Sequence, residues 1–334
     1  MAACSSAMAI ELRHRARTVL AASALAALLA AVICPFLGGS GMDYAKLLRH
    51  EPPDWPIFVN LRLPRTLLAL LTGAALSASG AMFQALLRDA LATPSSLGVT
   101  AAAALGAVAA ISLAPVETTW FPLVWLCALA GAAAVIVLVA LLARSRKRFS
   151  AYTLLLTGIA VNGICSAIVL LLHSLAGITK SFQITHWLMG GIGAVEYSVL
   201  LLLAAVIVPV CFWVLRLTRV LNVVSYGDTW AAGRGVNCRQ ITWRGFVAGT
   251  VLVGTTTAVT GPIAFVGLIV PHLLRRVVGP DYRLLLPASV FGGGAFLAVC
   301  DTLARSVLAP IEIPVGVITA LLGGPFFVWL LWSR

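Results

Sequence analysis

Residues 245–274 read GFVAGTVLVGTTTAVTGPIAFVGLIVPHLL and lie between Arg244 and Arg275 without a single Lys, Arg, Asp or Glu. A run of 30 uncharged residues is typical of membrane segments, since a bilayer-spanning helix takes about 20 residues. A second run, residues 18–42, holds 25 uncharged positions. Over the whole chain 61% of the residues are apolar and 10% are charged, whereas a soluble domain carries about 25% charged residues. The sequence therefore predicts an all-α, polytopic membrane protein.

The apolar runs are numerous enough for about ten helices, at roughly 30 residues for each span and its loop. The first run follows a basic cluster, as in a signal peptide, but it is long enough to span and further spans follow, so we expect it to be retained. We expect the crossings at residues 18–36, 66–86, 97–114, 120–142, 152–173, 198–215, 245–260, 263–278, 284–308 and 315–332. Residues 1–334 then form one transmembrane domain, with residues 1–18 as an N-terminal segment in the cytoplasm.

The basic residues test this topology. Ten crossings place 17 of the Lys and Arg residues inside and 6 outside. Cytoplasmic loops of membrane proteins are enriched in Lys and Arg, so both termini are expected in the cytoplasm. The same rule accounts for the formal charge of +12, which in a soluble protein would suggest nucleic acid. We expect a lipid bilayer around the chain and no nucleic-acid partner.

The uncharged run of residues 245–274 is too short for two ordinary spans, which need about 40 residues. A single helix through it would be about 45 Å long and would reverse every later loop. Gly261-Pro262 lies in its middle, where a turn is easy and a continuous helix is not. We therefore expect a short helical hairpin, shielded in part by protein rather than lipid.

Small residues are dense in residues 73–80 and 101–110. Burial of apolar surface does not drive helices together in lipid, so their association depends on close packing. Helix faces made of small residues allow that close approach. These stretches favour a tightly packed bundle over a set of independent anchors.

Residues with catalytic chemistry are sparse. Asp301 and Arg305 are the clearly charged pair within an expected helix, and their spacing lets them meet on one face. His173, His186 and His272 have no partner at metal-ligand spacing, and the seven cysteines are scattered, so no metal site is expected. A GxxxxGK[ST] phosphate loop is also absent from the sequence. If transport here uses ATP, another chain hydrolyses it.

The richest loop is predicted inside, at residues 223–240. Gly227 and the pair Gly233 and Gly235 punctuate a potentially helical piece. A short helix, a glycine turn and a second helix would make a projecting knob, whereas the plain alternative is a solvated loop. Composition alone leaves these two interpretations equally open.

Five ordered stretches resemble the permease subunits of bacterial ABC importers for iron-siderophores, haem and cobalamin. The resemblance runs from about residue 19 to the C-terminus. The stretches are Leu61-Arg62-Leu63-Pro64-Arg65, residues 73–80 with Gln84, residues 265–275 followed by 279–287, Asp301-Thr302-Leu303-Ala304-Arg305, and residues 312–327.

This resemblance implies the permease of a type II importer in the bacterial inner membrane. Two ten-helix, cobalamin-permease-like subunits would surround a central pathway as a homodimer, with two ATPase subunits below and a periplasmic substrate-binding protein above. The permease would be no enzyme and would bind no cofactor, because ATP and Mg²⁺ belong to the ATPase subunits.

The resemblance also implies roles for individual residues. It matches residues 223–240 to cytoplasmic coupling helices that seat in the ATPase, which favours the knob over the solvated loop. The residues concerned are Ser225, Gly227, Asp228, Ala232, Gly233, Arg234 and Gly235. Arg62, Arg65 and Arg305 match arginines that meet glutamates of the binding protein. The alternatives are snorkelling for Arg62 and Arg65, and a structural pair with Asp301 for Arg305.

A cytoplasmic gate is implied after the second helix, at Asp89 and Leu91, and before the fifth, at Ser150 and Ala151. Relatives often carry Asn-Pro where this chain has Asp89-Ala90, so Leu91 is the better gate residue, because an apolar constriction can exclude water.

The translocation pathway is expected to be small, apolar and weakly polar, so that a large chelate passes without being held. Two segments supply this mixture, with Ser77, Ser79, Gln84, Thr157, Asn162 and Ser166. For each of these residues hydrogen bonding between helices is the alternative.

Three functions compete. The first is an importer permease for a metal chelate, with an iron chelate preferred, haem as the favoured single cargo and cobalamin as the alternative. The second is a secondary transporter driven by an ion gradient, which requires intramembrane carboxylates; Asp301 is the one candidate. The third is an intramembrane enzyme, which requires clustered polar residues at mid-membrane depth that the sequence does not show.

Overall fold

The computed structural model describes residues 2–38, 43–113, 121–145 and 151–332, and within these ranges the chain is helical and contains no strand. Its elements are α1 (Ala2–Ile33), η1 (Cys34–Phe36), α2 (Tyr44–Leu48), α3 (Asp54–Ile57), η2 (Phe58–Arg62), α4 (Leu63–Leu87), η3 (Pro94–Leu97), α5 (Val99–Leu113), α6 (Phe121–Ser145), α7 (Ala151–Leu175), α8 (Ile178–Leu188), α9 (Tyr197–Arg216), α10 (Thr218–Ser225), α11 (Asp228–Gly233), α12 (Cys238–Thr260), α13 (Val266–Val278), α14 (Tyr282–Ser306) and α15 (Val315–Trp332).

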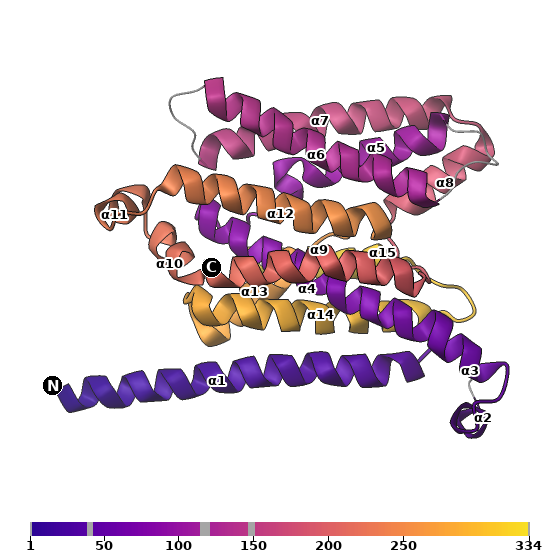
Figure 1. Cartoon of the computed structure of the whole chain (residues 1–334), viewed down its shortest axis with the longest axis horizontal. Coiled ribbons are helices and arrows are strands. Elements are labelled where there is room, and N and C mark those ends of the chain that lie inside the picture. Colours follow the sequence, from indigo (N-terminus) through magenta and orange to yellow (C-terminus); the bar gives the residue numbers. More distant parts are fainter. Residues whose placement is uncertain (1, 39–42, 114–120, 146–150, 333–334) are drawn as a thin grey trace.

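In the described ranges, each stretch expected to cross a membrane is mainly helical, so the all-α prediction is confirmed. Within the described ranges six stretches are long and apolar enough to span a bilayer: Arg17–Phe36, Asp54–Leu87, Pro122–Leu142, Tyr152–Leu175, Tyr197–Arg216 and Tyr282–Ser306. Two shorter apolar helices, Val99–Leu113 and Val315–Leu330, accompany them. The long helices lie side by side along one direction (Figure 1). The chain is therefore a helical membrane bundle.

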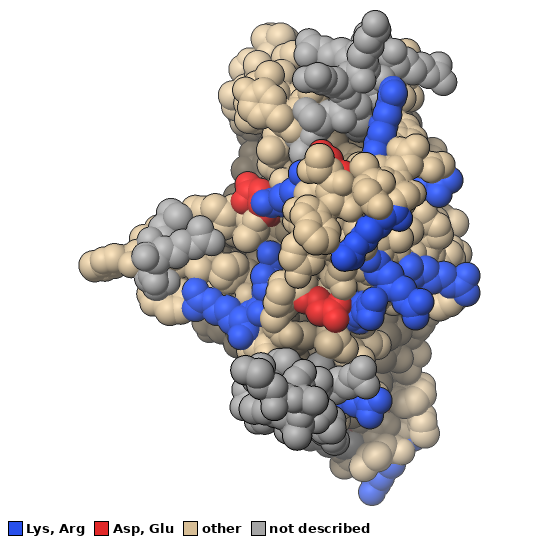
Figure 2. All heavy atoms as spheres, turned by 90° about the vertical axis from the view of Figure 1, so that its left-hand side faces the viewer, with Lys and Arg blue, Asp and Glu red and all other residues tan. Residues whose placement is uncertain are grey.

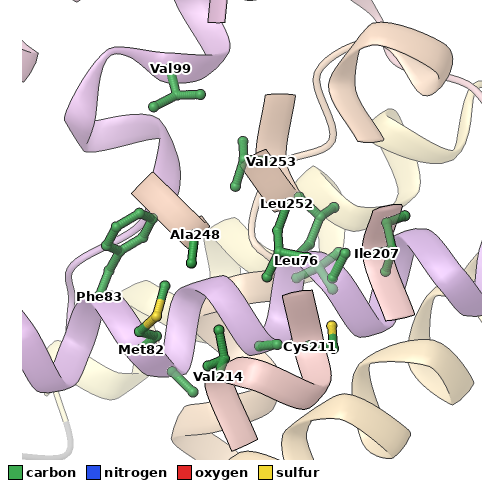
Figure 3. Close-up of a cluster of buried hydrophobic side chains, with 14 of the residues drawn as sticks. Leu76, Met82, Phe83, Val99, Ile207, Cys211, Val214, Ala248, Leu252 and Val253 are labelled. Atoms are coloured by element: carbon green, nitrogen blue, oxygen red, sulfur yellow. The ribbon is translucent and has the colours of Figure 1, made fainter. Parts of the chain in front are cut away.

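Helix α4 is the centre of the bundle. It crosses the middle of Figure 1 and packs against α14, α12, α13 and α9. The core around it is apolar (Figure 3), with Leu76, Met82 and Phe83 of α4 facing side chains such as Ile207 of α9 and Leu252 of α12. Buried side chains on all sides of α4 mean that its surface meets protein rather than lipid.

Glycines set how closely α4 approaches its neighbours. A Cβ on Gly73 would overlap the carbonyl oxygen of Gly293 in α14, and one on Gly80 would overlap that of Gly267 in α13. Without the Cβ atoms, backbones meet directly and gain dispersion contacts along their length. The expected close packing of residues 73–80 is confirmed.

The stretch around Gly261-Pro262 breaks as expected. Helix α12 ends at Thr260, Gly261 has φ +68°, and a Cβ there would overlap the carbonyl oxygen of Trp187. Helix α13 has only 13 residues, about 20 Å of helix, and its residues 266–272 are all buried. The expected shielding by protein is present. The expectation of a hairpin needs correction, because α13 packs on α4 and α14, whereas α12 packs on α4, α6, α5 and α9.

Polar side chains cap the N-termini of helices α12 and α14. The side-chain Oδ1 of Asn237 accepts from Gln240 N at 3.1 Å at the start of α12, and the Asp281 carboxylate accepts from Arg283 N at 2.9 Å at the start of α14. Each satisfies a backbone N–H that has no partner within its helix.

The two ends of the bundle differ. Helices α10 and α11 project at one end, where Figure 2 shows Lys and Arg side chains gathered on the surface; we call it the basic end. Helices α2, α3 and α8 lie at the other end, which we call the far end (Figure 1). Helix α8 was not expected from the sequence, because its 11 residues mix polar and apolar side chains.

Candidate functional site

The loop predicted as a knob is a pair of short helices at the basic end. Helix α10 begins at Thr218 rather than at residue 223, Gly227 has φ +137°, and α11 follows. Gly235, with φ +74°, turns the chain into α12. The solvated-loop alternative is therefore wrong, and both glycines occupy the left-handed region that other residues rarely adopt.

The surface of this pair suits a protein partner. Tyr226 is 77% exposed and Trp230 is 63% exposed. The Arg234 guanidinium lies 5.2 Å from the centre of the Trp230 ring, a cation–π contact. Burial, with a smaller contribution from the Asp228 carboxylate, raises the pKa of the nearby Cys238 thiol above its ordinary value. Exposed aromatic and Arg side chains are enriched where proteins bind one another.

The pair is tied to the end of α4 by Arg88. Arg88 has φ +55°, which ends the helix and turns its side chain toward the pair. Its Nε donates to the carbonyl oxygen of Val224 at 3.0 Å, and its Nη2 forms an ion pair with the Asp228 carboxylate. The core helix and the projecting helices are thus in direct polar contact.

A second set of contacts joins the pair to α13 and α14. Asn222 donates to the Asp281 carboxylate at 2.6 Å and accepts from Tyr282 N at 2.8 Å. Arg275 in turn donates to Gln84 Oε1 at 3.1 Å and to the Tyr282 hydroxyl at 2.9 Å. These contacts join α10 directly to the start of α14 and, through Tyr282 and Arg275, to α13 and α4.

The two halves of the expected gate are described unequally. The Asp89 carboxylate accepts from Leu91 N at 2.9 Å, which shapes the loop after α4, and Leu91 is half-buried. Ser150 lies outside the described residues, and for Ala151 only its place at the start of α7 is described. The gate itself stays a prediction.

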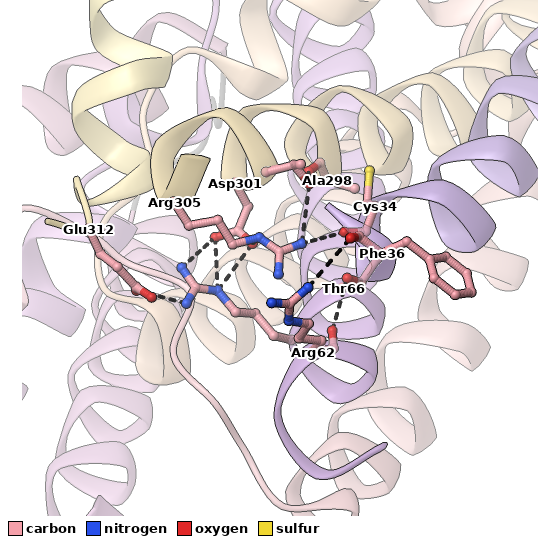
Figure 4. A network of polar contacts seen from close by, with 10 residues as sticks. Cys34, Phe36, Arg62, Thr66, Ala298, Asp301, Arg305 and Glu312 are labelled. Atoms are coloured by element: carbon pink, nitrogen blue, oxygen red, sulfur yellow. Dashed lines mark hydrogen bonds and ion pairs between the residues drawn. The ribbon is translucent and has the colours of Figure 1, made fainter. Parts of the chain in front are cut away.

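At the far end a network of charged side chains joins α4 to α14 (Figure 4). Arg65 donates to both carboxylate oxygens of Asp301, at 3.0 to 3.2 Å, and to Glu312 at 2.8 Å. The expected pair of Asp301 with Arg305 is present at 3.7 Å, but Arg65 is the closer partner. Asp301 is 1% exposed, so its charge is compensated by two guanidinium groups rather than by water.

The other two arginines hold the end of the first helix. Arg305 donates to the Cys34 carbonyl oxygen at 2.7 Å, and Arg62 donates to that of Phe36 at 3.4 Å (Figure 4). Both guanidinium groups are buried, so Arg62 does not snorkel toward an interface. All three arginines are engaged inside the subunit, and their role in docking a binding protein stays a prediction.

The residues expected to line the pathway fall into two groups. Ser77, Ser79 and Gln84 of α4 are buried inside the subunit, and Ser79 and Gln84 bond to the carbonyl oxygens of Leu76 and Gly267. The Gln84 contact with α13 matches the alternative of hydrogen bonding between helices, whereas the Ser79 bond lies within α4.

The second group lies on α7, nearer the surface. Thr157 donates to the Thr153 carbonyl oxygen at 2.8 Å, Asn162 donates to that of Ser95 at 2.8 Å, and Ser166 is exposed. The pathway assignment of both groups stays a prediction. Among the described residues, no group of three His, Cys, Asp or Glu side chains is placed to hold a metal ion.

Several of these contacts could not be read from the chain. Arg65 and Asp301 are separated by 236 positions, and Asn222 and Asp281 by 59. Helix-face periodicity relates only neighbours three or four residues apart. The sequence feature that could have indicated these contacts is a charged or amide side chain at the edge of an apolar run.

The pattern of the whole chain has a counterpart among known proteins: a model of the FecCD transport family matches residues 24–333. The chain belongs to the FecCD transport family. Since that match covers nearly the whole length, the resemblance predicted from the sequence motifs is confirmed. This FecCD chain is accordingly a multi-pass membrane permease, and the family is not itself catalytic.

Other members of the family are similar over most of their length. The hemin transport system permease protein HmuU of Yersinia pestis is 39% identical over 88% of this chain and 89% of its own. The vitamin B12 import system permease protein BtuC of Salmonella paratyphi A is 40% identical over 84% and 86%. A metal-chelate type ABC transporter, solved in an inward-facing conformation, superposes with a TM-score of 0.83 at 30% identity, over 96% of this FecCD chain and 100% of that one.

Proposed function

We propose that the chain is the membrane-spanning permease subunit of an ATP-driven importer that moves haem from the periplasm to the cytoplasm. The observation that carries the proposal is the 39% identity with the hemin permease HmuU, which extends over 301 residues. BtuC has a similar identity over 288 residues, so cobalamin is the second cargo to be tested.

The basic end faces the cytoplasm in this proposal, since Lys and Arg are enriched on that side of a membrane (Figure 2). Helices α1, α4, α5, α6, α7, α9, α12, α13, α14 and α15 make ten crossings, which puts both termini in the cytoplasm. Two copies form a homodimer around the pathway in the inner membrane.

The helix pair α10–α11 seats on a partner ATPase subunit, which binds ATP and Mg²⁺. Its exposed Tyr226 and Trp230 side chains support this assignment. The contacts of Arg88 and Asn222 then connect the ATPase to α4, α13 and α14. The far end receives the periplasmic substrate-binding protein.

An ion-gradient-driven transporter is less well supported. Such a protein needs a carboxylate that an incoming ion can reach. Asp301 is buried and already holds Arg65 and Arg305, so its charge is compensated.

Uptake by reconstituted complexes tests the proposal. The permease is purified with its ATPase subunit, placed in liposomes with the binding protein on the outside, and supplied with ATP inside. We expect haem to accumulate only with ATP and the binding protein, and no accumulation when the ATPase cannot hydrolyse ATP. Accumulation driven by a proton or sodium gradient without ATP would overturn the importer assignment. Uptake of cobalamin but not of haem would show that cobalamin, and not haem, is the cargo.

A further inference from the structure

A cavity of about 580 Å³ opens at the far end, where α8 meets the end of α12 and the segment before α15. Its size lies within the range of small-molecule sites, roughly 300 to 1,000 Å³. The lining is largely apolar and aromatic, and its polar side chains are few. Among the lining residues are Arg65, Phe182, His186, Trp187, Thr260 and Glu312.

The structure separates two histidines that the sequence left equivalent. The His173 Nε2 atom is hydrogen-bonded to the hydroxyl groups of Thr185 and Ser181, at 3.1 and 2.9 Å, which gives His173 a structural role. His186 is exposed and stacks on Phe182, with 6.3 Å between the ring centres. Over the part of the chain that the structure describes, no hydrogen bond reaches its ring nitrogens. His186 therefore presents an unengaged imidazole to the cavity.

The charges beside His186 are already paired. Arg65 is bound to Asp301 and Glu312, so neither its guanidinium nor that part of Glu312 is free to hold a ligand. The imidazole is the remaining group that can donate a lone pair to a metal ion. Phe182 and Trp187 offer flat apolar surface next to it. A nitrogen donor beside aromatic rings suits a flat macrocycle with iron at its centre.

We propose that His186 is an axial ligand for the iron of haem as haem enters this cavity, an inference that rests on the proposed cargo. A ring nitrogen of His186 donates its lone pair to the ferric iron, a bound water leaves, and no electron is transferred. Haem iron is commonly held by histidine. A ferric siderophore has no open iron position, so the same imidazole discriminates against it.

A single exposed ligand also fits a transport step. His186 is the one histidine among the cavity's lining residues and the cavity is open at the far end, so haem is held from one side and can leave. His186 thus acts as a selective point of entry and leaves the rest of the pathway free of tight contacts.

The test uses the permease–ATPase complex in detergent, titrated with haemin and followed by visible absorption. We expect the wild type to give the spectrum of histidine-ligated ferric haem. His186→Ala should lose that spectrum and bind haemin more weakly by on the order of tenfold. Added imidazole should restore the spectrum in His186→Ala. Metal-free protoporphyrin should bind both proteins equally, because it has no iron to ligate.

His50→Ala is the matched control, because His50 is also an exposed histidine of the far end, packed edge-to-face against Trp55 and outside the cavity lining. It should leave the spectrum unchanged. Co-purification of the ATPase reports that each variant is folded. An unchanged spectrum and affinity in His186→Ala would overturn the inference, while ATP-dependent haem uptake by the wild type would keep the proposed function. If the wild type takes up only another chelate, both the cargo and this inference fail.

Discussion

Arg88 at the end of α4 forms an ion pair with Asp228 at the start of α11, so the central helix of the bundle is held directly to the projecting helices. The same guanidinium donates to the Val224 carbonyl oxygen of α10 at 3.0 Å. Arg88 therefore contacts both helices of the pair from the one helix that touches most of the core. Arg88 also directly precedes the loop that carries Leu91, so the helix pair is in contact with the residue that begins this loop.

Breaking this contact should uncouple transport from hydrolysis. Both side chains are partly exposed, so the ion pair contributes about 1 kcal/mol or less to stability and its loss should leave the fold intact. In Arg88→Ala we expect ATP hydrolysis to persist while the amount of cargo moved per ATP falls severalfold. Simultaneous uptake and phosphate-release assays in liposomes measure this ratio.

The charge-exchanged double variant, Arg88→Asp with Asp228→Arg, separates coupling from a general defect. Restoration of part of the ratio would identify the ion pair itself as the coupling element. A ratio equal to that of the wild type in Arg88→Ala would show that the contact transmits nothing.

Asp301 should be the most costly charge to remove. Taking away one member of a buried ion network leaves uncompensated charge, at a cost of about 3–5 kcal/mol. In Asp301→Ala, Arg305 would lose its carboxylate partner and Arg65 would keep only the exposed Glu312. We expect a clearly lower unfolding temperature, followed with a thiol-reactive dye that reports exposure of the buried cysteines, such as Cys34 and Cys300.

Glu312→Gln is the control for this network. Glu312 is 61% exposed and its contact with Arg65 is a surface pair, so its replacement should change the unfolding temperature little. Equal effects of Asp301→Ala and Glu312→Gln would mean that the network does not hold α4 to α14.

The contact of Gly80 with Gly267 should tolerate no added side chain. Because a Cβ on Gly80 would overlap backbone atoms of α13, Gly80→Ala forces the two helices apart and should destabilise the bundle by about 1–3 kcal/mol. Gly163→Ala in α7 adds the same methyl group into open space and should be neutral or slightly stabilising. The dye-detected unfolding temperatures of the two variants give the comparison, and equal values would contradict the close approach.

The sequence predicted the helices well because each is a long apolar run bounded by charged or turn-forming residues. Gly261-Pro262 likewise marked the break between α12 and α13, since glycine there adopts φ +68°. Which helices pack together could not be predicted in the same way. Both α12 and α13 are suited to pack on α4, and only three-dimensional packing decides that they do so separately.

The candidate sites were predictable to different degrees. The glycine positions predicted the helix pair, because Gly227 and Gly235 adopt positive φ angles that other residues rarely adopt. The arginines of the far end were recognised from their motifs, but their burial was not, since the partner of Arg65 lies 236 positions away. Helix α8 is only 11 residues long and mixes polar with apolar side chains, so it was not expected from the sequence, and neither was the cavity beside it.

Gly235 should be required for assembly with the ATPase. It has φ +74°, and a Cβ there would meet open space, so the cost of a substitution comes from the backbone rather than from a clash. Gly235→Val should shift the turn between α11 and α12 and reduce both ATPase co-purification and hydrolysis stimulated by the binding protein. Gly233→Ala, at a helical position that also faces open space, should keep both. Wild-type assembly of Gly235→Val would exclude the helix pair as the coupling element.

Cysteine labelling should divide the residues expected to line the pathway into reached and protected sites. In a background without the seven native cysteines, we expect Ser166→Cys on the exposed face of α7 to react with a membrane-impermeant thiol reagent, and reaction to fall when ATP and the binding protein close the pathway. Ser77→Cys and Val161→Cys should stay protected, because both side chains are buried inside the subunit. A lipid-facing Ser166 would react in no state, since the charged reagent does not enter the bilayer. That outcome would move the pathway away from α7, whereas labelling of Ser77→Cys in any state would show that α4 opens during transport and lines the route.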